Sequence, residues 1–394
     1  MKLNSIITQK KYPKPQRIIM PTSINYQIPR PGGTETYIRN LIRNTIEFEI
    51  KVFLLCIGKE KREDYNGKLQ IIPVTRKAKN ELIFTLKMLI KKGLGFFRFS
   101  NNTIIVANGE HYCLPFLIFG KKHKIILIAH GATLPTLKIK KSGQYIWLYE
   151  HLVEKLVINK VDKIIAVNKD AKKYYQEKYE LQPNKIIEIP IGVDISLFKP
   201  LNRVEIREKY GFRSDDRIII YIGRFAKEKR IDILLKSFKD IEKQINSKLF
   251  LIGSGPEQKN LKSLAFKLKL KNVIFHEPVK NEEIPKIINC ADVLVLCSDF
   301  EEMPTIILEA LACGVPVVSS NVGDVNKVVN DKTGYLLEDV NYITIKDAIL
   351  DVIGNGRHYY QNNCILVAKR YSWKSISQKI MDVYVDVLMD KKLK

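Results

Sequence analysis

The sequence has no apolar run that could cross a bilayer, which takes about 20 consecutive apolar residues. The longest candidate, residues 112–120, is interrupted by Pro115 and is much too short. Residues 1–16 lack the apolar core of a signal peptide, so we expect no export. With 394 residues, 45% of them hydrophobic and 27% charged, the composition is typical of a soluble protein with two domains.

Metal and cofactor motifs are also missing. The six cysteines form no C-x-x-C pair and several lie in apolar runs, which favours buried free thiols in a reducing cytosol over a zinc site. The glycine loop at Gly32 and Gly33 is not a G-x-G-x-x-G motif, so a dinucleotide-binding fold proper is not supported. We expect no cofactor.

Acidic residues are scarce relative to basic ones, and the net charge is +24. Residues 1–194 contain 34 Lys and Arg against 16 Asp and Glu, so most of the excess lies in the first half. This predicts an anionic partner, such as anionic lipid or a phosphorylated acceptor; a generally basic background is the alternative. Nucleic acid is disfavoured, because no helix-turn-helix, zinc or aromatic RNA-binding motif occurs.

The most informative stretch is residues 299–320, which follows an apolar run at residues 291–298. Together they predict a strand, a tight loop, a helix and another strand. Gly314 is expected to end the helix and Pro304 to begin it. The free N–H groups near Thr305 would favour an anion such as phosphate. Glu301 and Glu309 beside an anion site make sense if they accept hydrogen bonds from hydroxyl groups, so phosphate plus hydroxyls suggests a sugar nucleotide.

Two further glycine loops in the second half follow predicted strands. The strand at residues 218–222 ends at Gly223 and Arg224, with Lys229 shortly after, and a second strand ends at Gly253. Two cations at one strand end would neutralise a diphosphate, and arginine could bind it bidentately. The alternative is ordinary surface charge on a basic protein.

The first half alternates buried, near-continuous apolar strands with helical segments, the order of an α/β fold with a parallel sheet. Gly32 and Gly33 permit close backbone approach to a ligand. His130 falls at the end of one predicted strand, before Gly131, where ligands are expected. A structural histidine is the alternative.

One segment, residues 82–99, is both apolar and basic, and no Asp or Glu occurs from Leu82 to Gly109. Its pattern predicts a helix with Lys87 and Lys91 one turn apart. Such a helix could lie on an anionic membrane surface, or it could be a core helix with a solvated basic edge.

Together these motifs resemble the retaining glycosyltransferases of family 4, which have the GT-B fold: α/β, with two Rossmann-like doubly wound domains facing across a cleft. Five motifs occur in family order. In the first half they are G-G-x-E at Gly32 to Glu35, H-G at His130 and Gly131, and I-P-x-G-V-D at Ile189 to Asp194. In the second half they are G-R-x4-K at Gly223 to Lys229 and E-x7-E at Glu301 to Glu309. The sequence departs from the family at Arg230 and Glu302, where glycine is usual, and at Met303 and Pro304, where many members have F-G.

The resemblance implies roles for these residues. Arg224 and Lys229 would hold the donor diphosphate, Glu309 the nucleotide ribose and Glu301 the hydroxyls of the transferred sugar. His130 would lie near the reacting sugar, and the Gly33 loop would close the site. No D-x-D motif follows a comparable strand, so we expect no metal. We expect catalysis by His130, Arg224, Lys229 and Glu301, and donor binding by Gly32, Gly33, Gly223, Arg224, Lys229, Gly253, Glu301, Pro304, Thr305 and Glu309.

The predicted domains are residues 1–193 on the acceptor side, residues 194–368 for the donor, and a helix at residues 369–394 that crosses back, with a linker within residues 185–200. We expect transfer from a UDP- or GDP-sugar to a glycan or lipid-linked acceptor in cell-surface polysaccharide or glycolipid synthesis. The protein would be cytoplasmic or peripheral on the inner face of the cell membrane. The alternatives are a sugar-nucleotide epimerase of the same fold and a non-catalytic protein that binds anionic glycan or lipid.

Overall fold

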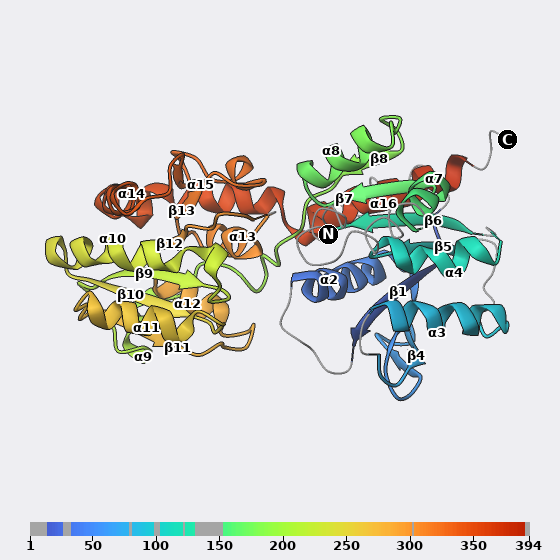
Figure 1. Cartoon of the computed structure of the whole chain (residues 1–394), viewed down its shortest axis with the longest axis horizontal. Helices are drawn as coiled ribbons and strands as arrows, with labels where there is room; N and C mark the ends of the chain where they lie inside the picture. The colour runs from blue at the N-terminus through green and yellow to red at the C-terminus, as the bar shows by residue number, and fades with distance from the viewer. Residues whose placement is uncertain are drawn as a thin grey trace. The chain divides into compact units, whose positions relative to one another are not determined.

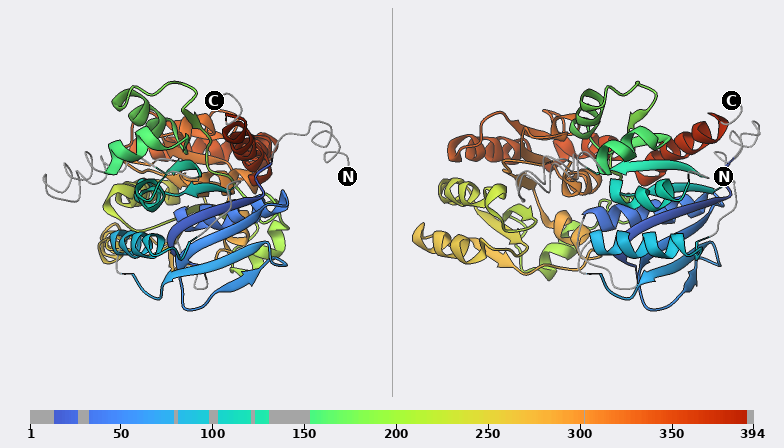
Figure 2. Two further views of the ribbon diagram at one scale, coloured as in Figure 1. Left: turned by 90° about the vertical axis from the view of Figure 1, so that its right-hand side faces the viewer. Right: turned by 45° about the vertical axis from the view of Figure 1, so that its right-hand side comes forward.

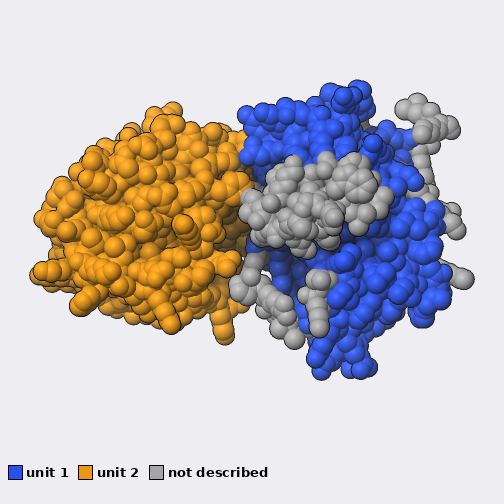
Figure 3. Space-filling model, viewed as in Figure 1, with its two compact units in different colours: residues 1–190, 376–394 blue, residues 191–375 orange. Residues whose placement is uncertain are grey.

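The chain forms two compact units, shown in Figure 3. The structure is a computed structural model, and it describes residues 14–26, 33–78, 81–97, 103–120, 123–130, 153–301 and 303–390. Unit 1 comprises residues 1–190 and 376–394, and unit 2 comprises residues 191–375. The division at residue 190 falls inside the predicted linker, and the final segment belongs to the first unit.

Unit 1 is built on an eight-stranded sheet in the order β3-β4-β2-β1-β5-β6-β7-β8 (Figure 1). All pairs are parallel except β3–β4 at the edge, which the sequence patterns did not predict. The elements are β1 (Arg17–Asn25), α2 (Gly33–Glu47), β2 (Lys51–Ile57), β3 (Arg62–Asp64), β4 (Leu69–Thr75), α3 (Glu81–Gly93), β5 (Thr103–Ala107), η1 (Glu110–Cys113), α4 (Leu114–Ile118), β6 (Lys124–Ala129), α7 (Lys155–Lys160), β7 (Lys163–Ala166), α8 (Lys169–Lys178), β8 (Ile186–Glu188) and α16 (Trp373–Met389).

Helices cover both faces of this sheet (Figure 2). On one face, Phe84 and Met88 of α3 share a core with alternate strand residues such as Ile105 and Leu127, together with side chains from α4, α7 and α8. On the other face α16 packs near α2, where Tyr384 is buried close to Tyr37 and Thr45. Burial of the strands on both faces explains their uninterrupted apolar sequences.

Unit 2 contains a six-stranded, fully parallel sheet in the order β11-β10-β9-β12-β13-β14. Counted from β9, this is the strand order 3-2-1-4-5-6 of a Rossmann fold. The elements are α9 (Arg203–Lys209), β9 (Arg217–Ile222), η3 (Lys227–Lys229), α10 (Ile231–Gln244), β10 (Ser247–Ile252), α11 (Gln258–Lys267), β11 (Val273–His276), α12 (Ile284–Cys290), β12 (Val293–Leu296), α13 (Thr305–Ala312), β13 (Val317–Ser320), η4 (Val325–Lys327), β14 (Gly334–Leu337), α14 (Tyr342–Asn355) and α15 (Arg357–Arg370).

The segments through which the chain leaves and re-enters unit 1 are joined to each other within unit 2. The Val193 N–H donates to the Tyr371 carbonyl at 2.8 Å, and the Trp373 N–H donates to the Val193 carbonyl at 3.1 Å. Gly192 lies against the Trp373 ring, where a Cβ atom would come within 2.7 Å of it. Glycine is therefore required at this contact.

Two negative findings concern only the described part of the chain. No helix there has the length and apolarity needed to span a membrane. No group of three or more His, Cys, Asp or Glu side chains is arranged there to hold a metal ion. All six cysteines are buried and free, as the apolar runs around several of them predict.

Candidate active site

Several predicted donor-binding residues of unit 2 follow the two strands between which its strand order reverses. Strands β9 and β12 are hydrogen-bonded neighbours, and the crossovers run away from them in opposite directions. Gly223 and Arg224 follow β9, and Glu301 follows β12 after a short loop. Ligands of open α/β sheets bind outside the carboxyl ends of the strands at such a switch point.

Lys229 and Glu301 are in direct contact at this edge. Lys229 Nζ donates to Glu301 Oε1 at 2.5 Å, and Ser298 Oγ donates to the same oxygen at 2.8 Å. Both charged side chains are mostly buried, with exposed fractions of 20% for Lys229 and 15% for Glu301. The loops are also joined through the backbone, because the Asp299 N–H donates to the Glu228 carbonyl at 2.8 Å. The pair is therefore held from two separate strands.

Arg224 is arranged differently from Lys229. Its backbone carbonyl accepts a hydrogen bond from the Tyr221 hydroxyl at 3.0 Å, which fixes the loop after β9. Its side chain is exposed and has no ion-pair partner among the described residues. The site thus combines one cation already paired with a carboxylate and one that is available to an anion.

Glycines let the tips of β9 and β10 touch. Gly253 has φ of +145°, and a Cβ atom there would lie 1.9 Å from the Gly223 carbonyl oxygen. Gly255 is equally restricted, since its Cβ would lie 2.3 Å from the Phe225 carbonyl oxygen. No side chain fits at either position without moving the backbone, so the close approach of the two loops requires glycine.

Helix α13 supplies the second glutamate. Pro304 is its N-cap and Thr305 its first residue, so the first-turn N–H groups lie at the carboxyl edge of the sheet. At the other end Gly314, with φ of +73°, ends the helix in a Schellman motif: the Val315 and Gly314 N–H groups donate to the Ala310 and Leu311 carbonyls. This confirms the predicted end of the helix. Glu302 lies outside the described residues.

Glu309 projects from the middle of α13 and is largely buried. Burial raises the pKa of its carboxyl to about 7, and a hydrogen bond from the Thr305 side chain partly opposes this shift. A carboxyl group of this kind is poised to change protonation near neutral pH, as is common at functional sites.

Unit 1 carries the remaining predicted residues. His130 follows β6, and its Nε2 lies 3.1 Å from Asn108 Oδ1 at the end of the neighbouring β5. The Tyr37 ring packs edge-on against the imidazole with centroids 4.7 Å apart. Burial lowers the pKa of His130 to about 4, so the imidazole is neutral at physiological pH. An N–H at Nε2 of the neutral ring would donate to this amide oxygen.

Asn108 and Tyr37 were missed by the sequence analysis. Asn108 directly follows an apolar strand and precedes a glycine, the same signal that drew attention to His130. Gly33 is the exposed first residue of α2, and Glu35 forms an ion pair of 2.7 Å with Arg39. Gly32 and Gly131 lie outside the described residues.

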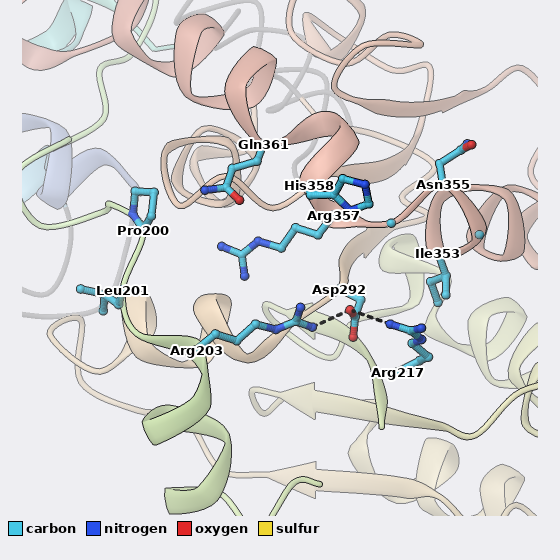
Figure 4. A pocket seen from close by; sticks show the side chains of 12 residues that line it. Pro200, Leu201, Arg203, Arg217, Asp292, Ile353, Asn355, Arg357, His358 and Gln361 are labelled. Atoms are coloured by element: carbon cyan, nitrogen blue, oxygen red, sulfur yellow. Dashed lines mark hydrogen bonds and ion pairs between the residues drawn. The ribbon is translucent and has the colours of Figure 1, made fainter. Parts of the chain in front are cut away.

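Cavities in unit 2 lie beside or away from these residues. One of about 500 Å³ borders Arg230 and Asp299, whose side chains form an ion pair of 2.7 Å. Another of about 460 Å³ lies at the amino ends of β9 and β12, the opposite edge of the sheet (Figure 4). Neither is lined by Arg224, Lys229, Glu301 or Glu309.

The cavity at the amino edge is organised by one carboxylate. Asp292 is 5% exposed and contacts Arg203 at 2.5 Å and Arg207 at 2.7 Å, and it also accepts a hydrogen bond from the Ile218 N–H at 2.7 Å. Arg217 approaches it at 3.9 Å from the other side, as Figure 4 shows. These contacts tie α9, β9 and β12 together, so the cluster has a clear structural role.

Comparison with known proteins identifies the family. A model described as Glycosyltransferase Family 4 matches residues 31–197, and one described as Glycosyl transferases group 1 matches residues 202–371. The chain belongs to glycosyltransferase family 4. The fold is therefore GT-B and the protein is a glycosyltransferase, which agrees with the two Rossmann-like sheets. These matches favour the transferase over the epimerase and the non-catalytic binding protein.

Relatives of this glycosyltransferase are distant. It is 25% identical to N-acetyl-alpha-D-glucosaminyl L-malate synthase of Bacillus anthracis over 72% of this chain and 75% of that protein. It is 24% identical to an uncharacterized glycosyltransferase of Methanocaldococcus jannaschii over 91% and 96% of the two chains.

Solved structures share its fold at still lower identity. Sucrose-phosphate synthase from Thermosynechococcus elongatus superimposes with a TM-score of 0.78 at 19% identity, covering 95% of this chain and all of the other. HepE of Anabaena, solved in complex with UDP and glucose, superimposes with a TM-score of 0.71 at 17% identity over 93% and 98% of the two chains.

Proposed function

We propose that this glycosyltransferase moves a sugar from a UDP- or GDP-linked donor to a glycan or lipid-linked acceptor, with retention of the anomeric configuration. The observation that carries the proposal is the ion pair of Lys229 with Glu301 beside the switch point of the unit 2 sheet. Arg224 follows one of the two strands there, and Glu309 lies on the helix that follows the other. A cation for a diphosphate and a carboxylate for hydroxyl groups thus share one sheet edge. The UDP named with the Anabaena structure, a fold relative, supports a nucleotide donor.

In the proposed mechanism the main task is to stabilise the leaving diphosphate. Negative charge grows on its oxygen as the glycosidic C–O bond breaks, and Arg224, Lys229 and the first-turn N–H groups of α13 would face that charge. Interactions that strengthen as this charge develops lower the barrier more than they stabilise bound substrate. We expect these groups to balance the diphosphate without a metal ion, so that a chelator leaves the rate unchanged.

The two glutamates would hold the hydroxyl groups of the donor. Glu301 already accepts hydrogen bonds from Lys229 and Ser298, and it would exchange part of this set for the sugar hydroxyls. Glu309 would accept the ribose hydroxyls. His130, neutral because of its burial, would act near the reacting sugar as a hydrogen-bonding group rather than as a cation.

We further propose that the reaction serves cell-surface polysaccharide or glycolipid synthesis on the cytoplasmic face of the membrane. The support is the concentration of positive charge in residues 1–194, which suits an anionic surface or a phosphorylated lipid-linked acceptor.

A panel of UDP-, GDP- and ADP-sugars tests the proposed donor. One nucleotide should raise the melting temperature of the protein, and its sugar form should be hydrolysed slowly without acceptor. Arg224→Ala should mainly lower turnover, whereas Lys243→Ala, on the exposed outer surface of α10, is the matched control. The absence of stabilisation by any nucleotide would refute the proposed donor site.

A further inference from the structure

Helix α3 exposes a row of large apolar side chains to solvent. Leu82, Leu86 and Ile90 are spaced four residues apart and therefore share one face of the helix. They are 55% to 59% exposed. The opposite face is buried through Phe84 and Met88, which belong to the core of unit 1. The helix is thus apolar on two faces, and only one of them is covered by the protein.

The exposed row continues beyond the end of α3. Leu94 is 70% and Phe96 68% exposed. The Phe119 ring, just after α4, lies against Gly93, where a Cβ atom would come within 2.9 Å of it. We call the set the α3 surface; it comprises Leu82, Leu86, Ile90, Leu94, Phe96, Ile118 and Phe119, all at least 46% exposed. Figure 1 shows α3 and α4 side by side. Contiguous exposed apolar groups of this extent mark an interaction site.

Lysines border the α3 surface on both sides. On one side Lys87 Nζ donates to Thr75 Oγ1 at 2.9 Å, and Lys91 Nζ donates to the Pro73 carbonyl at 3.4 Å, both at β4. On the other side Lys92 Nζ donates to the Phe97 carbonyl at 2.9 Å. The sequence has no Asp or Glu from residue 82 to residue 109. The surface is therefore apolar in its middle and positive at its edges.

We propose that the α3 surface docks on a membrane rich in anionic lipid. An apolar face flanked by lysines is the pattern of a helix that lies in the membrane interface, with its apolar side chains among the acyl chains and its ammonium groups at lipid phosphates. Docking would keep the enzyme at the membrane where its lipid-linked acceptor resides. Only this biological purpose rests on the proposed function, because the binding itself needs neither donor nor acceptor.

A second copy of the chain fits the α3 surface less well. A symmetric contact through the same face would bring Lys87, Lys91 and Lys92 of each copy close to one another. Residues 82–109 contain no acidic side chain to offset the repulsion, and Glu81, at the start of α3, already lies 3.4 Å from His111. The positive charge around the α3 surface therefore favours an anionic partner over a second copy of the chain.

Flotation with lipid vesicles tests the proposal on the full chain without substrates. The protein should bind vesicles that contain phosphatidylglycerol and stay unbound with pure phosphatidylcholine. The Leu86→Ser/Ile90→Ser variant and the Lys87→Gln/Lys91→Gln variant should each weaken binding to the anionic vesicles at least tenfold. Raising the salt concentration should weaken the binding of the wild type.

Control measurements distinguish a specific loss of vesicle binding from misfolding and from damage to the proposed donor site. Phe266→Ser changes an apolar side chain of unit 2 that is 86% exposed, and it should bind vesicles like the wild type. All variants should keep the circular dichroism spectrum and the nucleotide affinity of the wild type. The proposal is overturned if the wild type ignores anionic vesicles, if the α3 variants bind them as tightly, or if those variants instead abolish a dimer of the wild type.

Discussion

Lys229 in η3 and Glu301 after β12 are 72 residues apart in the sequence and form an ion pair of 2.5 Å at the carboxyl edge of the unit 2 sheet. Before a donor binds, the cation proposed to hold the diphosphate is thus neutralised by the carboxylate proposed to hold the sugar. A complete donor offers a new partner to both groups. A nucleoside diphosphate without its sugar offers a partner only to Lys229.

This relationship predicts opposite effects of Glu301→Gln on binding and on turnover. The variant frees Lys229 from its counter-ion, so the affinity for the nucleoside diphosphate alone should rise by about 1 kcal/mol, roughly fivefold. Turnover of the sugar donor should fall by about 100-fold, because the sugar loses its carboxylate acceptor. Calorimetric titration and initial rates measure the two quantities.

Glu228→Gln is the matched control for Glu301→Gln. Glu228 is an exposed residue of η3 whose backbone carbonyl, not its side chain, accepts the hydrogen bond from Asp299. Glu228→Gln should change neither the affinity for the nucleoside diphosphate nor the turnover of the sugar donor. An unchanged affinity of Glu301→Gln for the nucleoside diphosphate would show that the ion pair does not compete with the ligand.

The strands and the residues at their carboxyl ends could be predicted from the sequence, because buried parallel strands have continuous apolar sequences that end in glycine or charged residues. Gly223 and Arg224 follow β9 as this pattern predicts. The pairing of Lys229 with Glu301 was not, because it depends on two strands becoming neighbours. The contacts of Asn108 and Tyr37 with His130 were missed for the same reason.

Helix α3 shows a different limit of sequence analysis. Its apolar residues occur on two faces, so periodicity alone could not decide which face enters the core. The structure buries Phe84 and Met88 and leaves Leu86 and Ile90 in solvent. One face of the helix therefore belongs to the core, and contact of the exposed face with a membrane surface stays a prediction. The pKa of Glu309 could not be predicted from the sequence either, since it depends on what surrounds the carboxyl group in the folded protein.

Glu309→Gln should stabilise the protein and weaken nucleotide binding. The carboxyl group loses its proton near pH 4.5 in the unfolded chain and near pH 7 in the folded one. Between these values the folded state binds more protons, so the free energy of unfolding falls as the pH rises through this window. At pH 8 the amide should therefore raise the free energy of unfolding by about 1 to 3 kcal/mol. Denaturant titrations at pH 5 and pH 8 measure the difference, which should be small at pH 5.

From the raised pKa of Glu309 we also predict how nucleotide binding depends on pH. If Glu309 accepts the ribose hydroxyls as a carboxylate, nucleotide affinity in the wild type should fall as the pH drops through about 7. Binding below this pH should release a proton, which calorimetry in buffers of different ionisation enthalpy detects. Glu309→Gln should bind weakly at every pH. A pH-independent affinity in the wild type would rule out this role.

Arg230 occupies a backbone conformation that favours glycine, the residue that the resemblance led us to expect at this position. Its φ and ψ are 50° and 35°, in the left-handed region between η3 and α10. Its guanidinium pairs with Asp299 at 2.7 Å. Arg230→Gly and Arg230→Ala both lose this pair, but only glycine relieves the backbone strain. The glycine variant should therefore be more stable than the alanine variant by about 1 kcal/mol in urea titrations, and equal stability would refute the strain.

Asp292→Ala should destabilise the protein without affecting nucleotide binding. The substitution leaves Arg207, 7% exposed, without the carboxylate at 2.7 Å, and removes the acceptor of the Ile218 N–H. Loss of one partner of a buried ion pair costs about 3 to 5 kcal/mol. Asp215→Ala is the control, because its ion pair with Arg213 is exposed and should contribute less than about 1 kcal/mol.

Since Asp292 lies at the amino edge of the sheet and the proposed donor site at the carboxyl edge, the folded Asp292→Ala protein should keep the nucleotide affinity of the wild type. A large loss of affinity measured well below its melting temperature would mean that the arginine cluster, and not the Lys229–Glu301 edge, holds the donor.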